Sequence, residues 1–99
     1  MDGRVIIWSK KASSIFDETL SSFKIHNSKS LHDKVRSLTL KLLIFPYIGK
    51  PVQNTNIRQF IIENYSIYYC VFEKEILIVL FWDNRRSPEL LEKELRKTL

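Results

Sequence analysis

The sequence has 99 residues, 44% of them hydrophobic and 27% charged, with a formal net charge of +5. This length predicts one domain, residues 1–99, with one modest core, and the longest apolar run, residues 76–82, is far shorter than the roughly 20 residues of a membrane-spanning helix. The single cysteine, Cys70, lies in an apolar segment, which favours a reducing compartment, so we expect a cytoplasmic protein that does not associate with membranes.

The first half of the chain predicts a strand followed by two helices. Residues 5–8 (VIIW) form a β-branched and aromatic run typical of a strand, and Ser9 suits a helix N-cap. Residues 26–30 are polar, and residues 30–33 (SLHD) resemble a capping box that would begin a second helix. Apolar residues spaced three and four apart mark one face of each helix: Ala12, Ile15, Phe16, Leu20 and Phe23 in the first, and Leu31, Val35, Leu38, Leu42 and Phe45 in the second. Residues 10–45 are therefore predicted to form a helical hairpin.

The second half predicts a loop and a three-stranded antiparallel meander. Pro46 and the glycine and proline of residues 49–51 end the helix, so residues 46–56 are expected to be a loop. Three strand-like runs follow, at residues 57–63, 65–72 and 75–82. The breaks between them are so short that they permit hairpins alone, because a parallel crossover needs a dozen or more residues.

The last predicted strand is apolar at both alternating sets of positions, so we expect both of its faces to be covered. Residues 83–86 (DNRR) form a polar exit loop, and Ser87 is placed to cap a short final helix with Pro88 at its first position. The expected fold is thus α+β: an N-terminal strand, an α-helical hairpin, a three-stranded antiparallel β-meander and a short C-terminal helix.

The sequence offers little for cofactor chemistry. Its histidines, His26 and His32, are not in a metal-ligand motif, and no CxxC or HExxH is present. Cys70 lies in the middle of a strand, where a thiol is usually an inert packing residue. With two glycines in the whole chain, no glycine-rich phosphate loop is possible. We therefore expect no metal and no cofactor.

Arginines and one tryptophan form the candidate binding set. Arg58 lies on the first meander strand, and Arg85 and Arg86 follow the last strand directly after Trp82. In an antiparallel meander Arg58 lies at the opposite end of the strands from Arg85 and Arg86. One interpretation is a patch that faces phosphate or an acidic protein, since tryptophan and arginine dominate binding hot spots. The other is that Trp82 is core, that Asp83 pairs with an arginine at the surface, and that the arginines are solvated.

Five segments resemble, in order, motifs of the RelE/ParE toxin superfamily, a group of toxins from type II toxin–antitoxin systems. Residues 8–12 (WSKKA) are similar to its opening strand-to-helix signature, and residues 46–51 (PYIGKP) to its proline-then-glycine turn. Arg58 matches the arginine near the start of its next strand. Residues 65–71 (YSIYYCV) and 82–88 (WDNRRSP) resemble its later strand and its exit loop.

The resemblance implies two possible activities. RelE-like members cleave messenger RNA on the ribosome with several basic residues and a C-terminal tyrosine, but this chain has Ser66, Phe60 and Leu91 near three of those positions. Arg58 and Arg85 are the candidate catalytic residues that remain for a nuclease. ParE-like members lack the nuclease residues and bind DNA gyrase, and the sequence leans toward this branch. A third possibility is a degenerate member that binds its antitoxin alone.

The resemblance also implies a cognate antitoxin as partner, in a hetero-oligomer, with DNA gyrase or the ribosome as target. The charge of +5 favours an acidic partner, although many small domains carry such a charge without one. The apolar last strand exposes more surface than one helical hairpin can cover. We therefore expect a partly disordered acidic antitoxin segment to fold onto this domain.

Overall fold

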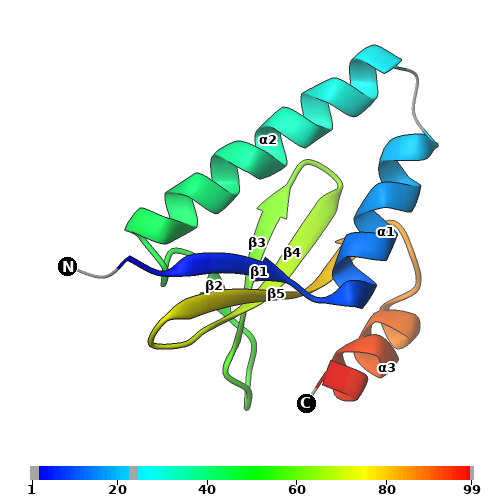
Figure 1. The fold of residues 1–99 in the computed structure, drawn as a ribbon. Helices are drawn as coiled ribbons and strands as arrows, with labels where there is room; N and C mark the ends of the chain where they lie inside the picture. Colours follow the sequence, from blue (N-terminus) through cyan, green and yellow to red (C-terminus); the bar gives the residue numbers. More distant parts are fainter. Residues whose placement is uncertain (1–2, 23–24, 99) are drawn as a thin grey trace.

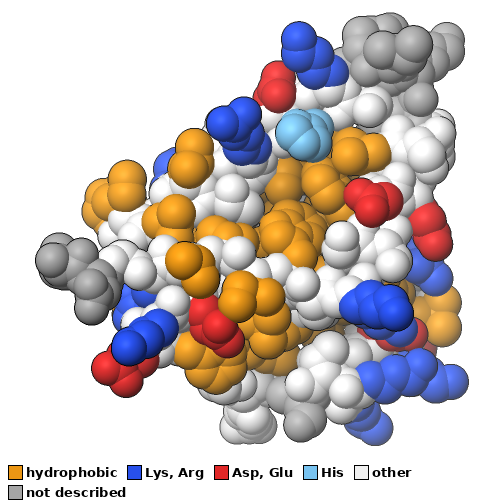
Figure 2. Space-filling view, in the orientation of Figure 1, with side chains coloured by type: hydrophobic (Ala, Val, Ile, Leu, Met, Phe, Trp, Pro, Cys, Tyr) orange, Lys and Arg blue, Asp and Glu red, His pale blue; other side chains and the backbone are white. Residues whose placement is uncertain are grey.

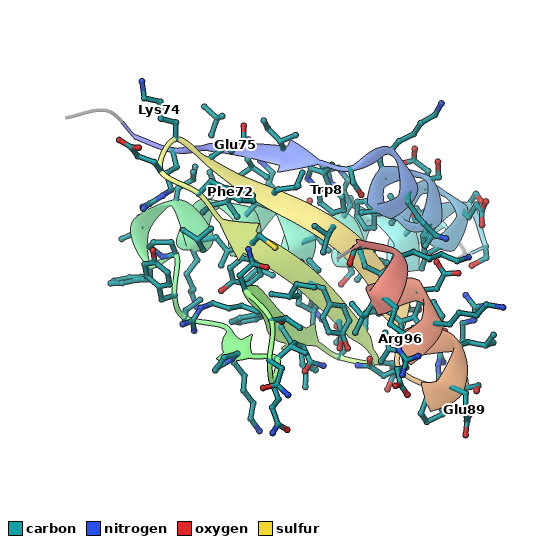
Figure 3. All side chains as sticks on the ribbon, turned by 90° about the horizontal axis from the view of Figure 1, so that it is seen from below. Trp8, Phe72, Lys74, Glu75, Glu89 and Arg96 are labelled. Carbon is teal, nitrogen blue, oxygen red and sulfur yellow. The ribbon has the colours of Figure 1, made fainter. Side chains whose placement is uncertain are left out.

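The structure, a computed structural model, describes residues 3–22 and 25–98. A five-stranded sheet with strand order β1-β5-β4-β3-β2 has α1 and α2 on one face and α3 on the other (Figures 1 and 3). In chain order the elements are β1 (Val5–Trp8), α1 (Lys10–Ser21), α2 (Ile25–Ile44), β2 (Lys50–Pro51), β3 (Ile57–Ile62), β4 (Tyr65–Val71), β5 (Glu75–Asp83) and α3 (Pro88–Thr98). No helix in the described part of the chain is long and apolar enough to span a membrane.

The first strand and the start of the first helix are confirmed. The hydroxyl of Ser9 accepts a hydrogen bond from the Ala12 backbone N–H at 3.0 Å and so caps α1. The sequence did not indicate that β1 pairs in parallel with β5, with Val5 opposite Glu75 and Trp8 opposite Ile78. This pairing is possible because the intervening helices and strands provide the long connection that a parallel pair requires.

The predicted break at residues 26–30 is wrong, because α2 already begins at Ile25 and residues 30–33 lie inside it. The first buried side chain described in α2 is Leu31, and Figure 1 shows the beginning of the helix extending past the sheet. Before it, Ser28 is half-buried and Lys29 and Ser30 are exposed, so these residues are polar although they are helical. Leu31, Val35, Leu38 and Leu42 form the buried stripe as predicted, whereas Phe45 follows the helix and is 60% exposed. Phe23 and the side chain of His26 lie outside the described residues.

The antiparallel meander is confirmed. In β3 and β4 Ile57 pairs with Cys70 and Ile62 with Tyr65, and in β4 and β5 Tyr65 pairs with Asp83. The predicted loop at residues 46–56 is wrong in one respect, because it contains β2, whose two residues pair with β3. A strand this short has no periodicity that a sequence pattern could reveal.

Both faces of β5 are covered, as its composition predicts. On one face Ile76, Ile78 and Phe81 pack in the core beneath α1 and α2. On the other face Leu80 and Trp82 belong to a second core, which Leu91 and Leu95 of α3 cover in part. The argument that a partner is needed to cover this strand is therefore wrong, because α3 of the same chain covers it.

Candidate functional site

The turn after β5 holds the first of the candidate arginines in a fixed position. The backbone N–H of Arg86 donates to the carbonyl oxygen of Asp83 at 3.0 Å, and that of Arg85 donates to Oδ1 of Asp83 at 2.9 Å. Aspartate favours the first position of such a turn because its side chain bonds the backbone two residues further on. The turn therefore fixes the direction in which both arginines leave the sheet.

Arg85 forms a two-pronged ion pair with Asp83. Its Nε lies 2.9 Å from Oδ1 of Asp83 and its Nη2 lies 2.8 Å from Oδ2. This pair lowers the pKa of Asp83, chiefly through the side-chain hydrogen bond, and raises that of Arg85. Nη2 also donates to the hydroxyl of Tyr65 at 3.3 Å, and the Tyr65 ring stacks on Phe81 at 5.3 Å. Tyr65, which is itself held by the core residue Phe81, therefore helps to orient the Arg85 side chain, and Asp83 partly neutralises its charge.

Arg86 is held in a different way. Its guanidinium lies 4.4 Å from the centre of the Trp82 ring, the geometry of a cation–π interaction. Within the described part of the chain no carboxylate forms an ion pair with Arg86. The structure thus positions this exposed cation by stacking and leaves its N–H donors available to a partner.

Trp82 itself does not form part of the accessible surface. Its side chain is 2% exposed and packs in the second core, beneath α3. The expectation that Trp82 serves as an exposed aromatic anchor does not fit this burial. Its place in the site is beneath Arg86, as the surface on which the guanidinium rests.

Arg58 lies in a separate place and is already occupied. Its Nη1 donates to the carbonyl oxygens of Gly49 at 2.7 Å and Tyr47 at 3.1 Å, and its guanidinium lies 5.0 Å from the Tyr47 ring. Arg58 therefore fastens the loop after α2 to β3. This loop is also held by the backbone N–H of Gly49, which donates to the hydroxyl of Tyr69 at 2.8 Å.

The strand register confirms that the arginines do not converge. Arg58 lies opposite Tyr69, whereas Asp83, two residues before Arg85, lies opposite Tyr65. Four residues of strand separate the two levels, which is about 13 Å. Arg58 and the Arg85–Arg86 pair are two separate sites.

Packing residues occupy the positions near which a nuclease would carry its reactive groups. Ser66 is fully buried, where it donates to Oδ1 of Asn84 at 2.7 Å and accepts from Nε2 of Gln59 at 2.9 Å. Phe60 packs against the core beneath the helical hairpin, and Leu91 packs against the second core. None of the three presents a cation or a proton donor to a substrate.

Sequence reasoning missed Tyr65 as part of the site, whereas it offered a surface pair between Asp83 and an arginine as an alternative, and the structure has this pair with Arg85. The Asp83–Arg85 spacing of two residues is a local signal for the ion pair, whereas the contact with Tyr65 depends on the strand register. Cys70 is buried, and burial raises the pKa of its thiol. Across residues 3–22 and 25–98, no group of three histidine, cysteine or acidic side chains is arranged to hold a metal ion.

Comparison with known proteins identifies a family and a related fold. The profile of a family described as the ParE toxin of type II toxin–antitoxin system, parDE, matches residues 6–88. A solved structure described as the chromosomal ParDE TA system from P. aeruginosa contains a chain with 21% sequence identity and a TM-score of 0.64, and the match covers 79% of this chain and 92% of that one. At this identity the likeness concerns the fold. The chain matches none of the curated proteins with which it was compared.

Proposed function

The chain belongs to the ParE toxin family of type II toxin–antitoxin systems, and we propose that it arrests growth by binding DNA gyrase until a protein antitoxin neutralises it. It acts by occupying its target and does not catalyse a reaction. We place both interactions in the cytoplasm, with the toxin stored in a hetero-oligomer with its antitoxin.

The separation of the arginines is the observation that carries the choice of a binding toxin over a nuclease. Cleavage of RNA needs cations gathered at one phosphate and a group that moves the 2′-hydroxyl proton. Arg58 is bonded to two carbonyl oxygens, and Arg85 is paired with Asp83 at the other end of the sheet. The buried Ser66 offers no substitute for a missing cation.

We assign the contact with the target to the Arg85–Arg86 turn. Arg86 is exposed and stacked on the buried Trp82, and among the described residues it forms no direct ion pair, although its charge acts on the nearby Asp83. Arg85 extends the same surface and is oriented by Asp83. A cation that is already held in place loses less side-chain entropy on binding, which favours it as a centre of affinity.

Exposed apolar side chains support an antitoxin partner. Leu40, Ile44, Phe45 and Tyr47 are 55%, 70%, 60% and 59% exposed, at the end of α2 and just after it. A cluster of this kind on a small domain marks a surface that another chain covers. The net charge of +5 favours an acidic covering chain.

Two purified systems distinguish the two activities. We expect the chain to inhibit DNA supercoiling by gyrase and to leave messenger RNA intact in a reconstituted translation system, and we expect its induction in cells to trigger the DNA damage response. The Arg85→Ala/Arg86→Ala double variant should fold, bind antitoxin and no longer inhibit supercoiling. Codon-specific cleavage of messenger RNA would overturn the proposal in favour of a nuclease, and a chain without effect in either system would identify a degenerate member that binds antitoxin alone.

A further inference from the structure

A row of three side chains crosses the sheet at the level of the arginine turn. Ile61 of β3 lies opposite Ser66 of β4, and Ser66 lies opposite Trp82 of β5. Residues that pair directly across strands place their side chains on one face of the sheet, and Trp82 identifies it as the face that α3 covers in part. Neighbouring strands lie about 4.8 Å apart, so the row is about 10 Å long.

Buried polar contacts fix the middle of the row. The hydroxyl of Ser66, which is fully buried, donates to Oδ1 of Asn84 at 2.7 Å and accepts from Nε2 of Gln59 at 2.9 Å. The backbone N–H of Asn84 donates to the carbonyl oxygen of Asn64 at 2.7 Å. Because Asn84 directly precedes Arg85, these bonds hold the arginine turn as well as the two side-chain amides.

Each position of the row offers a different chemical group to a partner. Ile61 is 60% exposed, although it lies on a strand. In the middle, Asn84 is exposed and Gln59 is half-buried, and among the described residues no hydrogen bond uses Nδ2 of Asn84 or Oε1 of Gln59. Arg86, stacked on Trp82, completes the row with an exposed cation. The surface thus changes from apolar to amide to cationic within about 10 Å.

This row continues the surface that we assign to the target. It extends the contact from Arg86 across two further strands on the α3 face. The apolar cluster that supports an antitoxin partner lies elsewhere, since its Leu40 and Ile44 belong to α2, along which Figure 2 shows hydrophobic side chains, and α2 covers the opposite face. A second copy of this chain fits poorly, because it would bring a net charge of +5 against Arg86.

The charges beside the row indicate what a partner must supply. Two carboxylates lie within two residues of the row, Glu63 and Asp83, and each already forms an ion pair, with Lys34 and Arg85. Arg86 is therefore the cation that a carboxylate of the partner can pair with. The side-chain amides carry both donors and acceptors, so they can bond the N–H and C=O groups of a main chain.

We infer that the target binds this row through a segment that presents a carboxylate to Arg86 and an apolar side chain to Ile61, about 10 Å apart, while its main chain bonds the amides of Asn84 and Gln59. The inference rests on the proposed binding of DNA gyrase and adds to it the extent of the contact surface and the chemistry of the bound segment.

A matched pair of substitutions tests the apolar end of the row. Ile61→Ser should raise the concentration of chain that halves gyrase supercoiling by about tenfold, because it removes an apolar contact. Val5→Ser makes a comparable change at a side chain that is 57% exposed on β1, toward the opposite edge of the sheet, and should alter that concentration by less than about twofold. Chemical denaturation should show that both variants are folded.

Photocrosslinking provides a second measurement that does not depend on potency. Cys70 is the one cysteine of the chain and is buried, so a thiol-reactive photocrosslinker added to the Ile61→Cys variant attaches at position 61. Irradiation with purified gyrase should join this variant to a gyrase subunit. The same label on the Val5→Cys variant should give no such product.

The outcomes separate this inference from the proposed function. If Ile61→Ser is as potent as the unmodified chain while Arg86→Ala is not, or if the label at position 61 does not reach gyrase, the contact ends at the arginine turn and the inference is wrong. If Ile61→Ser instead weakens binding of the acidic protein encoded by the neighbouring reading frame and leaves gyrase inhibition intact, the antitoxin occupies the row and the inference is wrong. If the unmodified chain does not inhibit gyrase, the proposed function fails together with the inference.

Discussion

Substitution of Arg86 should weaken binding to the target strongly while it changes the stability of the fold little. In the Arg86→Ala variant the cation 4.4 Å above the Trp82 ring is lost. An exposed cation–π interaction contributes about 0.5–1 kcal/mol, a small part of the roughly 5–15 kcal/mol that stabilises a domain. The variant should therefore fold and unfold cooperatively at a slightly lower denaturant concentration.

Inhibition of gyrase should respond much more strongly. An arginine at the centre of a binding surface contributes about 2 kcal/mol or more, which corresponds to a loss of affinity of about 30-fold. The assay is the concentration of purified chain that halves gyrase supercoiling, measured beside chemical denaturation. Arg86→Lys should have an intermediate potency, because lysine keeps the charge but lacks the planar group that stacks on Trp82.

Arg96→Ala is the matched control, because it removes the same kind of side chain from the exposed side of α3. It should retain the inhibitory potency of the unmodified chain. If Arg86→Ala is folded and equally potent, the turn after β5 is not the contact with the target, and Arg58 and the Lys10–Lys11 start of α1 become the next candidates.

Three further substitutions test the packing around the site. Trp82→Ala should lower the free energy of unfolding by about 3–5 kcal/mol, measured by chemical denaturation, because the indole is 2% exposed; a loss below about 1 kcal/mol would contradict its core position. Gly49→Ala should cost about 1–3 kcal/mol in the same assay, because its Cβ would lie 2.5 Å from the hydroxyl of the buried Tyr69; an unchanged stability would mean that the loop moves freely. The pair with Arg85 lowers the pKa of Asp83 from 3.8, so its stabilisation is present above that pH and is lost as the pH falls through the lowered value. In the Asp83→Asn variant the melting temperature should fall less steeply as the pH is lowered from neutral to acid. An unchanged fall in melting temperature would argue against the pair.

Local patterns predicted most of the fold. The N-cap at Ser9 and the short breaks of the meander depend on neighbouring residues, and the structure confirms them. The parallel partner of β1 and the two-residue β2 depend on contacts between distant segments, which no local pattern contains. The start of α2 was misplaced because polar composition indicated a break where the helix continues beyond the sheet.

The candidate site was predictable in its residue types and not in its arrangement. Turn-prone residues after an apolar strand placed Arg85 and Arg86 at a strand end, where the structure has them. Whether Trp82 faces a partner or the core could not be decided from sequence, because β5 is apolar at both alternating sets of positions. The answer depends on α3, whose Leu91 and Leu95 pack in the same core as Trp82.

The position of Trp82 also bears on how a partner could silence the toxin. The strand that carries the arginine turn is packed on both faces, so distortion of the turn would disturb two cores and would be costly. If the proposed antitoxin acts at the arginine turn, we therefore expect it to cover Arg86 and not to deform the sheet, which would leave the released chain ready to bind its target without refolding.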